Sequence, residues 1–193
     1  ERRTIGSIKE SLFYSRDEER ILEIARSPKL IAITLTVTEK AYKADSEFIQ
    51  RLVRVLRERY ESNGGSIAVI SCDNMPSNGD FVKNLVREVI KDHKFWDWID
   101  SNIRFPNCMV DRIVPAPSKD NRLLVRTELF NQWVIEKDPI SKYLESSGVQ
   151  FVDSVKPYEL AKIRLFNGIH SYLAYYGELN GIEFIADIIA IPQ

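Results

Sequence analysis

Three polar residues interrupt an otherwise apolar helical pattern late in the chain: Lys162, Asn167 and His170. At 100° per residue in an α-helix, His170 lies about 80° and Asn167 about 140° around the axis from Lys162. Glu159 falls at about 60°, so all four side chains are expected on one side of the helix. Burial lowers the pKa of a lysine, so a buried Lys162 could act as a general base.

The same spacing allows a simpler, structural interpretation. Glu159 and Lys162 could form an exposed ion pair three residues apart on the helix. His170 could then be a core histidine whose hydrogen bonds are satisfied inside the protein. Spacing alone favours this structural interpretation and leaves the catalytic one open.

A second candidate site is the polar segment 71–79, Ser-Cys-Asp-Asn-Met-Pro-Ser-Asn-Gly, which directly follows a strand-like run. Ligands bind at the carboxyl ends of parallel strands, so this position suits a binding site. The amide of Asn74, like that of Asn167, could donate a hydrogen bond to an oxygen that gains negative charge during a reaction. The alternative is a polar turn that caps the following helix.

A third candidate is the segment 105–115, where Asp111 and Arg112 interrupt apolar residues. A salt bridge inside the protein is the simpler interpretation of these two charges.

Metal and thiol chemistry fit less well. Zinc would need ligands from Cys72, Cys108, His93 and His170, and none of these lie at the short spacing of zinc sites, so no metal is expected. Cys72 could be a nucleophile with His170 as its base, but nothing marks the thiol as activated. The eight glycines form neither Gly-x-Gly-x-x-Gly nor Gly-x-x-x-x-Gly-Lys, so these residues contain no such phosphate-binding turn.

The elements that must position these residues alternate between strand and helix. Two β-branched runs suit buried parallel strands, and helical stripes precede, separate and follow them. Ser46 is the expected N-cap of the middle helix, and Asn63-Gly64-Gly65 ends it. The expected strands are 30–38 and 66–71, and the expected helices are 17–26, 46–62 and 78–90. This alternation predicts a βαβ arrangement and an α/β fold.

The second half of the chain has a different pattern. The stretches 102–117 and 123–134 are strand-like and rich in proline, and about twenty residues of helical spacing follow Pro157. We place a domain boundary near residue 155, which gives an α/β part at 1–154 and a helical part at 155–193.

Composition restricts the class of protein. Of 193 residues, 44% are hydrophobic and 28% charged, which is typical of a globular protein and not of a disordered one. A net charge of −1 argues against a nucleic-acid partner. Two distant cysteines form no disulfide framework, and no apolar stretch is long enough to span a bilayer or to act as a signal peptide. We therefore expect a cytoplasmic protein without a membrane partner.

Six segments of the chain, taken in order, resemble those of a known family, the polyol-specific long-chain dehydrogenase/reductases. This family includes mannitol 2-dehydrogenase and mannonate oxidoreductase (fructuronate reductase). Together the segments cover nearly the whole chain. They are Thr36-Val-Thr-Glu-Lys-Ala-Tyr, Ser71-Cys-Asp-Asn, Phe105-Pro-Asn-Cys-Met-Val-Asp-Arg-Ile, Gln132-Trp-Val-Ile-Glu, Gly148-Val-Gln-Phe-Val-Asp and Lys162-x4-Asn167-x2-His170.

The resemblance implies a Rossmann-type NAD(P) domain followed by a mainly helical substrate domain, with the active site between them. It implies that Lys162 is the general base or acid and that Asn74 and Asn167 form an oxyanion hole. His170 would then orient the substrate, and Glu159 would relay the proton to solvent.

The resemblance also implies a cofactor, NAD or NADP, near Thr38 and Asn74, with Asp111 close to that site. The reaction would interconvert a sugar alcohol or sugar acid and its keto form, either mannitol and fructose or mannonate and fructuronate, without a metal. Family members are much longer, so the chain is expected to be an internal piece whose incomplete sheet favours self-association. The alternative is a catalytically silent binding module that keeps these segments for packing.

Overall fold

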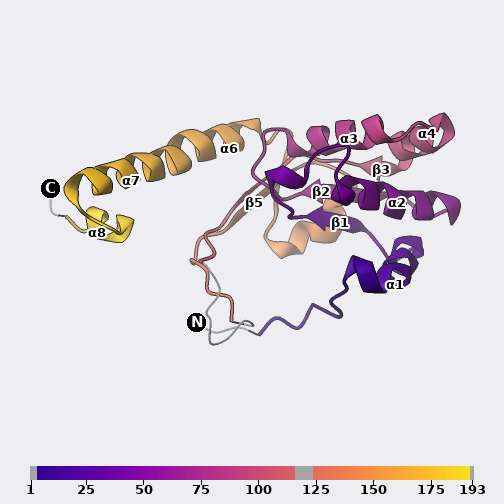
Figure 1. The fold of residues 1–193 in the computed structure, drawn as a ribbon, viewed down its shortest axis with the longest axis horizontal. Coiled ribbons are helices and arrows are strands. Elements are labelled where there is room, and N and C mark those ends of the chain that lie inside the picture. The colour runs from indigo at the N-terminus through magenta and orange to yellow at the C-terminus, as the bar shows by residue number, and fades with distance from the viewer. Residues whose placement is uncertain (1–3, 116–123, 192–193) are drawn as a thin grey trace. The chain divides into compact units, whose positions relative to one another are not determined.

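A computed structural model describes residues 4–115 and 124–191. The chain divides into two compact units, the first formed by Glu1–Pro106 with Asp138–Ile140, and the second by Asn107–Lys137 with Ser141–Gln193. Figure 1 shows the order of elements along the chain. The elements are α1 (Tyr14–Arg26), β1 (Ala32–Leu35), η1 (Glu39–Ala41), α2 (Glu47–Glu61), β2 (Ile67–Ser71), α3 (Asn78–Val89), α4 (His93–Asn102), β3 (Ile103–Arg104), β4 (Cys108–Asp111), β5 (Gln132–Glu136), α5 (Ser141–Leu144), η2 (Glu145–Ser147), β6 (Gln150–Val152), α6 (Lys156–Ala161), η3 (Lys162–Asn167), α7 (Gly168–Asn180) and α8 (Ile185–Ile189).

The first unit is built on a parallel sheet in the order β1-β2-β3. Helix α2 connects β1 to β2, and α3 and α4 connect β2 to β3, so the predicted βαβ arrangement and α/β fold are confirmed. Every residue of β2 is buried. Residues 30–38 do not form the fully buried strand that their sequence suggested, because β1 is shorter and leaves Thr34 exposed. Among the described residues β1 pairs with one strand only, so its other edge is less covered.

Helix α2 begins and ends where the sequence predicts. The hydroxyl oxygen of Ser46 accepts a hydrogen bond from the backbone N–H of Ile49 at 3.2 Å and thereby caps the helix. The helix ends at Glu61, and Asn63 adopts a left-handed backbone with φ 54°. Its apolar side chains join the main core of the unit, which is centred on β2 and includes Ile49, Leu52, Leu56, Val69, Val82, Val86, Phe95, Ile99 and Ile103.

Close backbone packing explains one glycine. A Cβ atom on Gly79, in the first turn of α3, would lie 2.3 Å from the carbonyl oxygen of Phe105. No flexible side chain could move aside to relieve that contact, so the approach of α3 to this backbone requires glycine.

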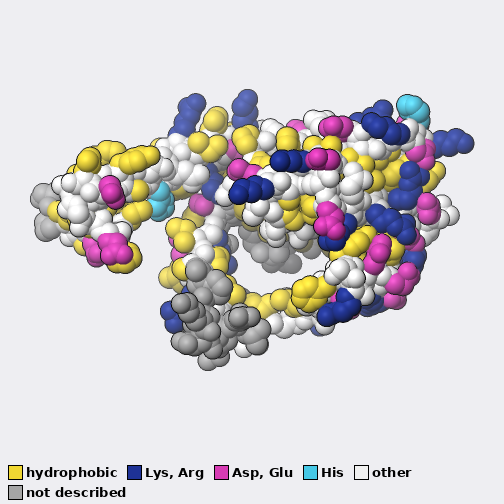
Figure 2. All heavy atoms as spheres, in the orientation of Figure 1, with side chains coloured by type: hydrophobic (Ala, Val, Ile, Leu, Met, Phe, Trp, Pro, Cys, Tyr) yellow, Lys and Arg dark blue, Asp and Glu magenta, His cyan; other side chains and the backbone are white. Residues whose placement is uncertain are grey.

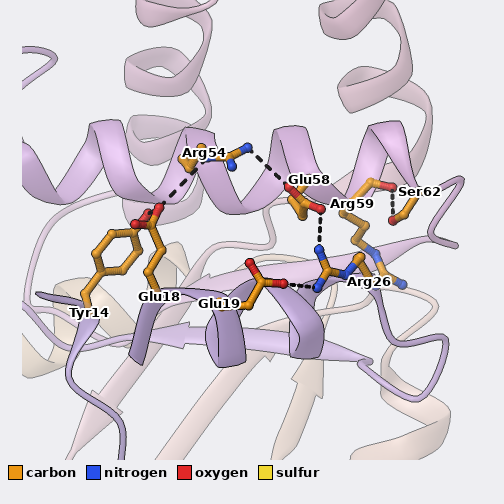
Figure 3. A network of polar contacts seen from close by, with 8 residues as sticks. All are labelled: Tyr14, Glu18, Glu19, Arg26, Arg54, Glu58, Arg59 and Ser62. Carbon is orange, nitrogen blue, oxygen red and sulfur yellow. Dashed lines mark hydrogen bonds and ion pairs between the residues drawn. The ribbon is translucent and has the colours of Figure 1, made fainter. Parts of the chain in front are cut away.

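A surface network of ion pairs joins α1 to α2 (Figure 3). The carboxylate of Glu58 accepts hydrogen bonds from Arg26 at 2.7 Å and from Arg54 at 3.2 Å. These side chains are partly exposed, so each pair contributes little alone, but the shared carboxylate ties the two helices together.

Arg59, at the end of α2, forms a second and buried link to α1. Its side chain is 1% exposed, and its guanidinium donates to three backbone carbonyls. Nε donates to Gly65 at 2.7 Å, while Nη1 donates to Ala25 at 2.6 Å and to Ser27 at 3.0 Å. Arg59 therefore satisfies carbonyls at the end of α1 and in the turn after α2.

The second unit contains a smaller sheet in the order β4-β5-β6, antiparallel between the first two strands and parallel between the last two. Met109, Val134 and Val155 form its buried core. The two predicted strand-like stretches are shorter in the structure. Residues 102–117 give two short strands, β3 and β4, and in 123–134 the described strand begins only at residue 132. Residues 116–123 lie outside the described part of the chain.

One continuous helical segment, Lys156–Asn180, carries most of the predicted site residues. Its existence confirms the helical pattern after Pro157. Its middle, η3, is a π-helix, which the sequence analysis did not predict. The backbone N–H of Gly168 donates to the carbonyl of Ile163, five residues earlier, as in π-helical hydrogen bonding.

Candidate active site

Lys162 is the first residue of η3 and is only 8% exposed. Its Nζ donates a hydrogen bond to the backbone carbonyl of Val110 and lies 3.5 Å from Oδ1 of Asp111. Both partners belong to β4, so the helix and the strand position the amine together. An exposed Glu159–Lys162 pair is therefore the wrong interpretation for Lys162, because its ammonium group is buried against a carboxylate of another element.

Glu136 holds the start of the helix that carries Lys162. Its Oε1 accepts from the backbone N–H of Val155 at 3.3 Å, and its Oε2 accepts from Nδ2 of Asn107 at 3.0 Å. The backbone N–H of Glu136 also donates to the carbonyl of Asn107 at 3.0 Å. One side chain thus joins the end of β5, the residue before β4 and the N-cap of α6. The sequence analysis gave no role to Glu136 or Asn107. The only signal for Glu136 was an acidic residue at the end of an apolar strand.

The π-helical segment changes how closely the direction of Asn167 follows that of Lys162. In an α-helix Asn167 would lie about 140° from Lys162. In a π-helix hydrogen bonds join residues five apart, so a side chain five positions later returns close to the starting direction. Asn167 is five residues after Lys162, and the segment therefore brings the two toward one side.

The environments of His170 and Glu159 also disagree with the structural interpretation, which expected a core histidine and an exposed glutamate. His170 is exposed, with Nδ1 3.1 Å from the carbonyl oxygen of Phe166, so it is not a core histidine. Glu159 is partly buried in α6. Of the residues predicted in this unit, the structure brings Lys162 and Asp111 into direct contact.

Thr38 and Asn74 belong to the first unit, where they follow β1 and β2. These strands are parallel neighbours, so both residues lie at the carboxyl edge of the sheet, and both are exposed. The carboxylate of Asp73 holds the backbone at this edge, since it accepts hydrogen bonds from the N–H groups of Val37 and Thr38 at 2.9 and 3.1 Å. Both residues therefore follow parallel strands as the sequence predicts, and their role toward a cofactor stays a prediction.

No group of three His, Cys, Asp or Glu side chains that could hold a metal occurs within residues 4–115 and 124–191. Among the helices in the described part of the chain, none has the length and apolar character needed to cross a membrane. Cys72 and Cys108 are not joined by a disulfide.

The helices at the end of the second unit leave many apolar side chains uncovered. Figure 2 shows hydrophobic side chains gathered on the surface of this segment. Those on α7 and α8 and between them include Ile169, Tyr172, Tyr175, Leu179, Phe184 and Ile189, each at least half exposed.

Comparison with known families matches both parts of the chain. Residues 1–146 match the family model described as the mannitol dehydrogenase Rossmann domain, and residues 154–193 match the mannitol dehydrogenase C-terminal domain. The chain belongs to the mannitol dehydrogenase family. Membership confirms the resemblance drawn from the six sequence segments and the Rossmann-type fold. The domain boundary near residue 155 stays a prediction.

Several mannitol dehydrogenase family proteins are similar over nearly the whole chain. D-mannonate oxidoreductase of Escherichia coli K12 is 35% identical over all of this chain and 48% of its own length. Mannitol 2-dehydrogenase of Pyrenophora tritici-repentis is 30% identical over 98% of this chain and 41% of its own. The alignment with the E. coli protein extends over 232 positions against 193 residues, so that relative contains insertions that this chain does not.

Solved structures of the family are similar in fold. Mannitol 2-dehydrogenase of Pseudomonas fluorescens, solved as a ternary complex with NAD and D-mannitol, matches with a TM-score of 0.74 and 32% identity. The match covers 93% of this chain and 44% of that one. A D-sorbitol dehydrogenase in substrate-free form also matches with a TM-score of 0.74, at 28% identity. The chain thus spans less than half the length of the relatives that it matches.

Proposed function

We propose that the protein containing this chain is an NAD(P)-dependent oxidoreductase that interconverts a sugar alcohol or sugar acid and its keto form. The observation that carries the proposal is the buried amine of Lys162 held by the carbonyl of Val110 and the carboxylate of Asp111. An amine held in a fixed direction is a group that can exchange a proton with a substrate positioned beside it. Family membership supplies the class of reaction, because relatives of this chain are named as dehydrogenases of mannitol and mannonate.

Lys162 would move the proton in this reaction. In alcohol oxidation, its neutral amine accepts the hydroxyl proton of the substrate, and in reduction, its ammonium returns that proton to the carbonyl oxygen. Asp111 compensates the positive charge of the ammonium form, while the Val110 carbonyl fixes the direction of Nζ. The cofactor, when bound, supplies the hydride acceptor or donor.

The amides of Asn74 and Asn167 would stabilise the negative charge that grows on the carbonyl oxygen during reduction. The π-helical turn supports this role for Asn167, because five residues of π-helix bring position 167 closer in direction to position 162 than an α-helix would. His170, exposed one turn further along, would hydrogen-bond to and orient the substrate, and Glu159 would exchange the proton with solvent.

The residues of the first unit fit a dinucleotide at the carboxyl edge of the sheet. Thr38 and Asn74 are exposed there after adjacent parallel strands, the position where α/β sheets bind nucleotides. Thr38 and Asn74 would hold the cofactor from this edge, and Asp111 would act from the second unit. NAD is the form bound in the P. fluorescens relative, and we propose NAD or NADP here. The substrate is a polyol such as mannitol or a hexonate such as mannonate, and fructose or the hexuronate fructuronate is the corresponding keto form.

The test is steady-state kinetics of the complete protein with NADH or NADPH and either fructose or fructuronate. Lys162→Ala should lower kcat and kcat/KM together by about 10² to 10⁴-fold, the usual contribution of a positioned acid–base group. Lys162→Arg should not restore the rate, because a guanidinium does not give up its proton near neutral pH. Asn74→Ala and Asn167→Ala should each cost about 10² to 10³-fold.

Lys156→Ala is the matched control, since Lys156 is an exposed lysine at the start of the same helix. It should leave kcat unchanged. If Lys162→Ala had the same kcat as Lys156→Ala, Lys162 would have only a structural role. A protein that consumes neither reduced cofactor with either substrate would favour the catalytically silent module.

A further inference from the structure

The side chain of Asp73 joins the ends of the two strands that carry the proposed cofactor edge. Its Oδ2 accepts from the backbone N–H of Val37 at 2.9 Å, and its Oδ1 accepts from that of Thr38 at 3.1 Å. Oδ2 also accepts from the hydroxyl of Tyr42 at 2.7 Å. Three donors that follow β1 thus converge on one carboxylate that follows β2.

The backbone that Asp73 holds is strained. Thr38 has φ 69° and ψ 154°, a conformation that a β-branched residue rarely adopts. Such a residue persists only when its surroundings impose the conformation, and strain of this kind is concentrated at ligand sites. The two adjacent N–H groups of Val37 and Thr38 both reach Asp73, so this carboxylate is the partner that fixes the strained turn.

Tyr42 extends the link into the core. It is a buried residue whose hydroxyl lies 2.9 Å from that of Ser71, the last residue of β2. Burial, reinforced by the hydrogen bond to Asp73, raises the pKa of Tyr42 well above its usual range, so the phenol keeps its proton. Because that proton is donated to Asp73, the Ser71 hydroxyl donates to Tyr42, and the hydrogen bonds run in one direction from Ser71 to Asp73.

The backbone beside Asp73 is also anchored. Nδ2 of Asn78, a buried residue in the first turn of α3, donates to the carbonyl oxygens of Ser71 at 2.8 Å and Asp73 at 3.2 Å. Asn74 directly follows Asp73, so the position of its amide depends on the same anchored segment.

We infer that Asp73 is a positioning residue that holds Thr38 and Asn74 at fixed places on the cofactor edge through its hydrogen bonds to Val37, Thr38 and Tyr42. This inference rests on the proposed function. A carboxylate is required because both of its oxygens accept, whereas an asparagine would turn an NH2 group toward one of the three donors. Asp73 acts through these residues and itself takes no part in the proton transfer.

The test compares Asp73→Asn with Asp45→Asn in the complete protein, Asp45 being an exposed aspartate near the same turn. The measurements are the Kd for NADH by fluorescence quenching, kcat and KM measured separately, and hydrogen exchange of the Val37 and Thr38 amides. Asp73→Asn should weaken NADH binding by about tenfold or more, the scale of one lost charge-assisted hydrogen bond, and speed exchange of both amides. Asp45→Asn should match the unmutated protein in all three.

A residue with only a structural role would lower the melting temperature and leave the Kd of the folded protein unchanged, and that result would overturn the inference. If Asp73→Asn does not fold, Tyr42→Phe takes its place, because it removes one of three donors and keeps both N–H bonds. It should raise the Kd for NADH by about threefold, and an unchanged Kd would likewise overturn the inference. An unmutated protein that does not bind NADH would instead refute the proposed function itself.

Discussion

Replacement of Arg59 by methionine tests how the buried guanidinium stabilises the first unit. Methionine keeps much of the aliphatic side chain and removes the three hydrogen bonds to the carbonyls of Ala25, Ser27 and Gly65. A buried acceptor left without its partner costs about 1 to 3 kcal/mol. Part of that cost is offset, because burial itself opposes the charged guanidinium and lowers the pKa of Arg59.

We therefore expect Arg59→Met to lower the free energy of unfolding by about 2 to 4 kcal/mol, less than the sum of three orphaned carbonyls. The free energy of unfolding of Arg59→Lys should lie between those of Arg59→Met and the unmutated protein. A lysine ammonium can reach some of the carbonyls but lacks the planar fork of donors. Arg54→Met is the control on the same helix. Arg54 makes exposed ion pairs, so its replacement should change stability by less than about 0.5 kcal/mol.

Urea unfolding followed by tryptophan fluorescence measures these differences. Trp96 and Trp98 both lie in α4 of the first unit, whereas Trp133 lies in β5 of the second. A Trp133→Phe background therefore leaves tryptophans of residues 1–193 only in the first unit. That change is mild, because the indole Nε1 of Trp133 has no hydrogen-bond partner among the described residues. If Arg59→Met cost less than about 1 kcal/mol or stabilised the unit, the carbonyls would be satisfied without Arg59, and the reasoning would be refuted.

Three further changes probe the same unit. Ser46→Ala removes the N-cap of α2 and should cost about 1 kcal/mol in urea unfolding, while Ser46→Asn should restore most of it. Gly79→Ala places a Cβ against the Phe105 carbonyl, so the melting temperature should fall even though alanine favours helix; an unchanged value would contradict the contact. The hydrogen bond from the Arg57 guanidinium, and to a smaller extent that from the backbone N–H of Phe95, hold the pKa of Asp92 below its usual range. The ionised Asp92 therefore stabilises the fold above about pH 4, and this stabilisation is lost as the pH falls further. Acid unfolding of Asp92→Asn should accordingly begin from a lower stability and depend less on pH in that range.

Local sequence signals predicted the parts of the fold that depend on near neighbours. The Ser46 cap, the stop after Glu61 and the alternation of strands with helices follow from residues a few positions apart. The extent of β1 could not be predicted in this way, because the burial of a strand depends on how many strands pair with it.

The candidate site was predictable in residue type and much less in geometry. The functional interpretation of Lys162 came from polar residues in an apolar helix, but its contact with Asp111 joins residues far apart in sequence. Asp73 and Glu136 lie in segments that the sequence singled out but received no role for the same reason, since each carboxylate binds donors from a distant segment. No periodicity reports such contacts, and only the folded chain brings them together.

The π-helical turn has a consequence for the length of the chain at this point. Such a turn is equivalent to one additional residue inserted in an α-helix. If the same number of residues formed a regular α-helix, everything downstream would be rotated by about 100° relative to α6. Helix content would be preserved while Asn167, His170 and the whole of α7 turned away from their present directions. The π-helical turn absorbs this additional residue, so the length of the segment and the directions of the side chains after it depend on each other.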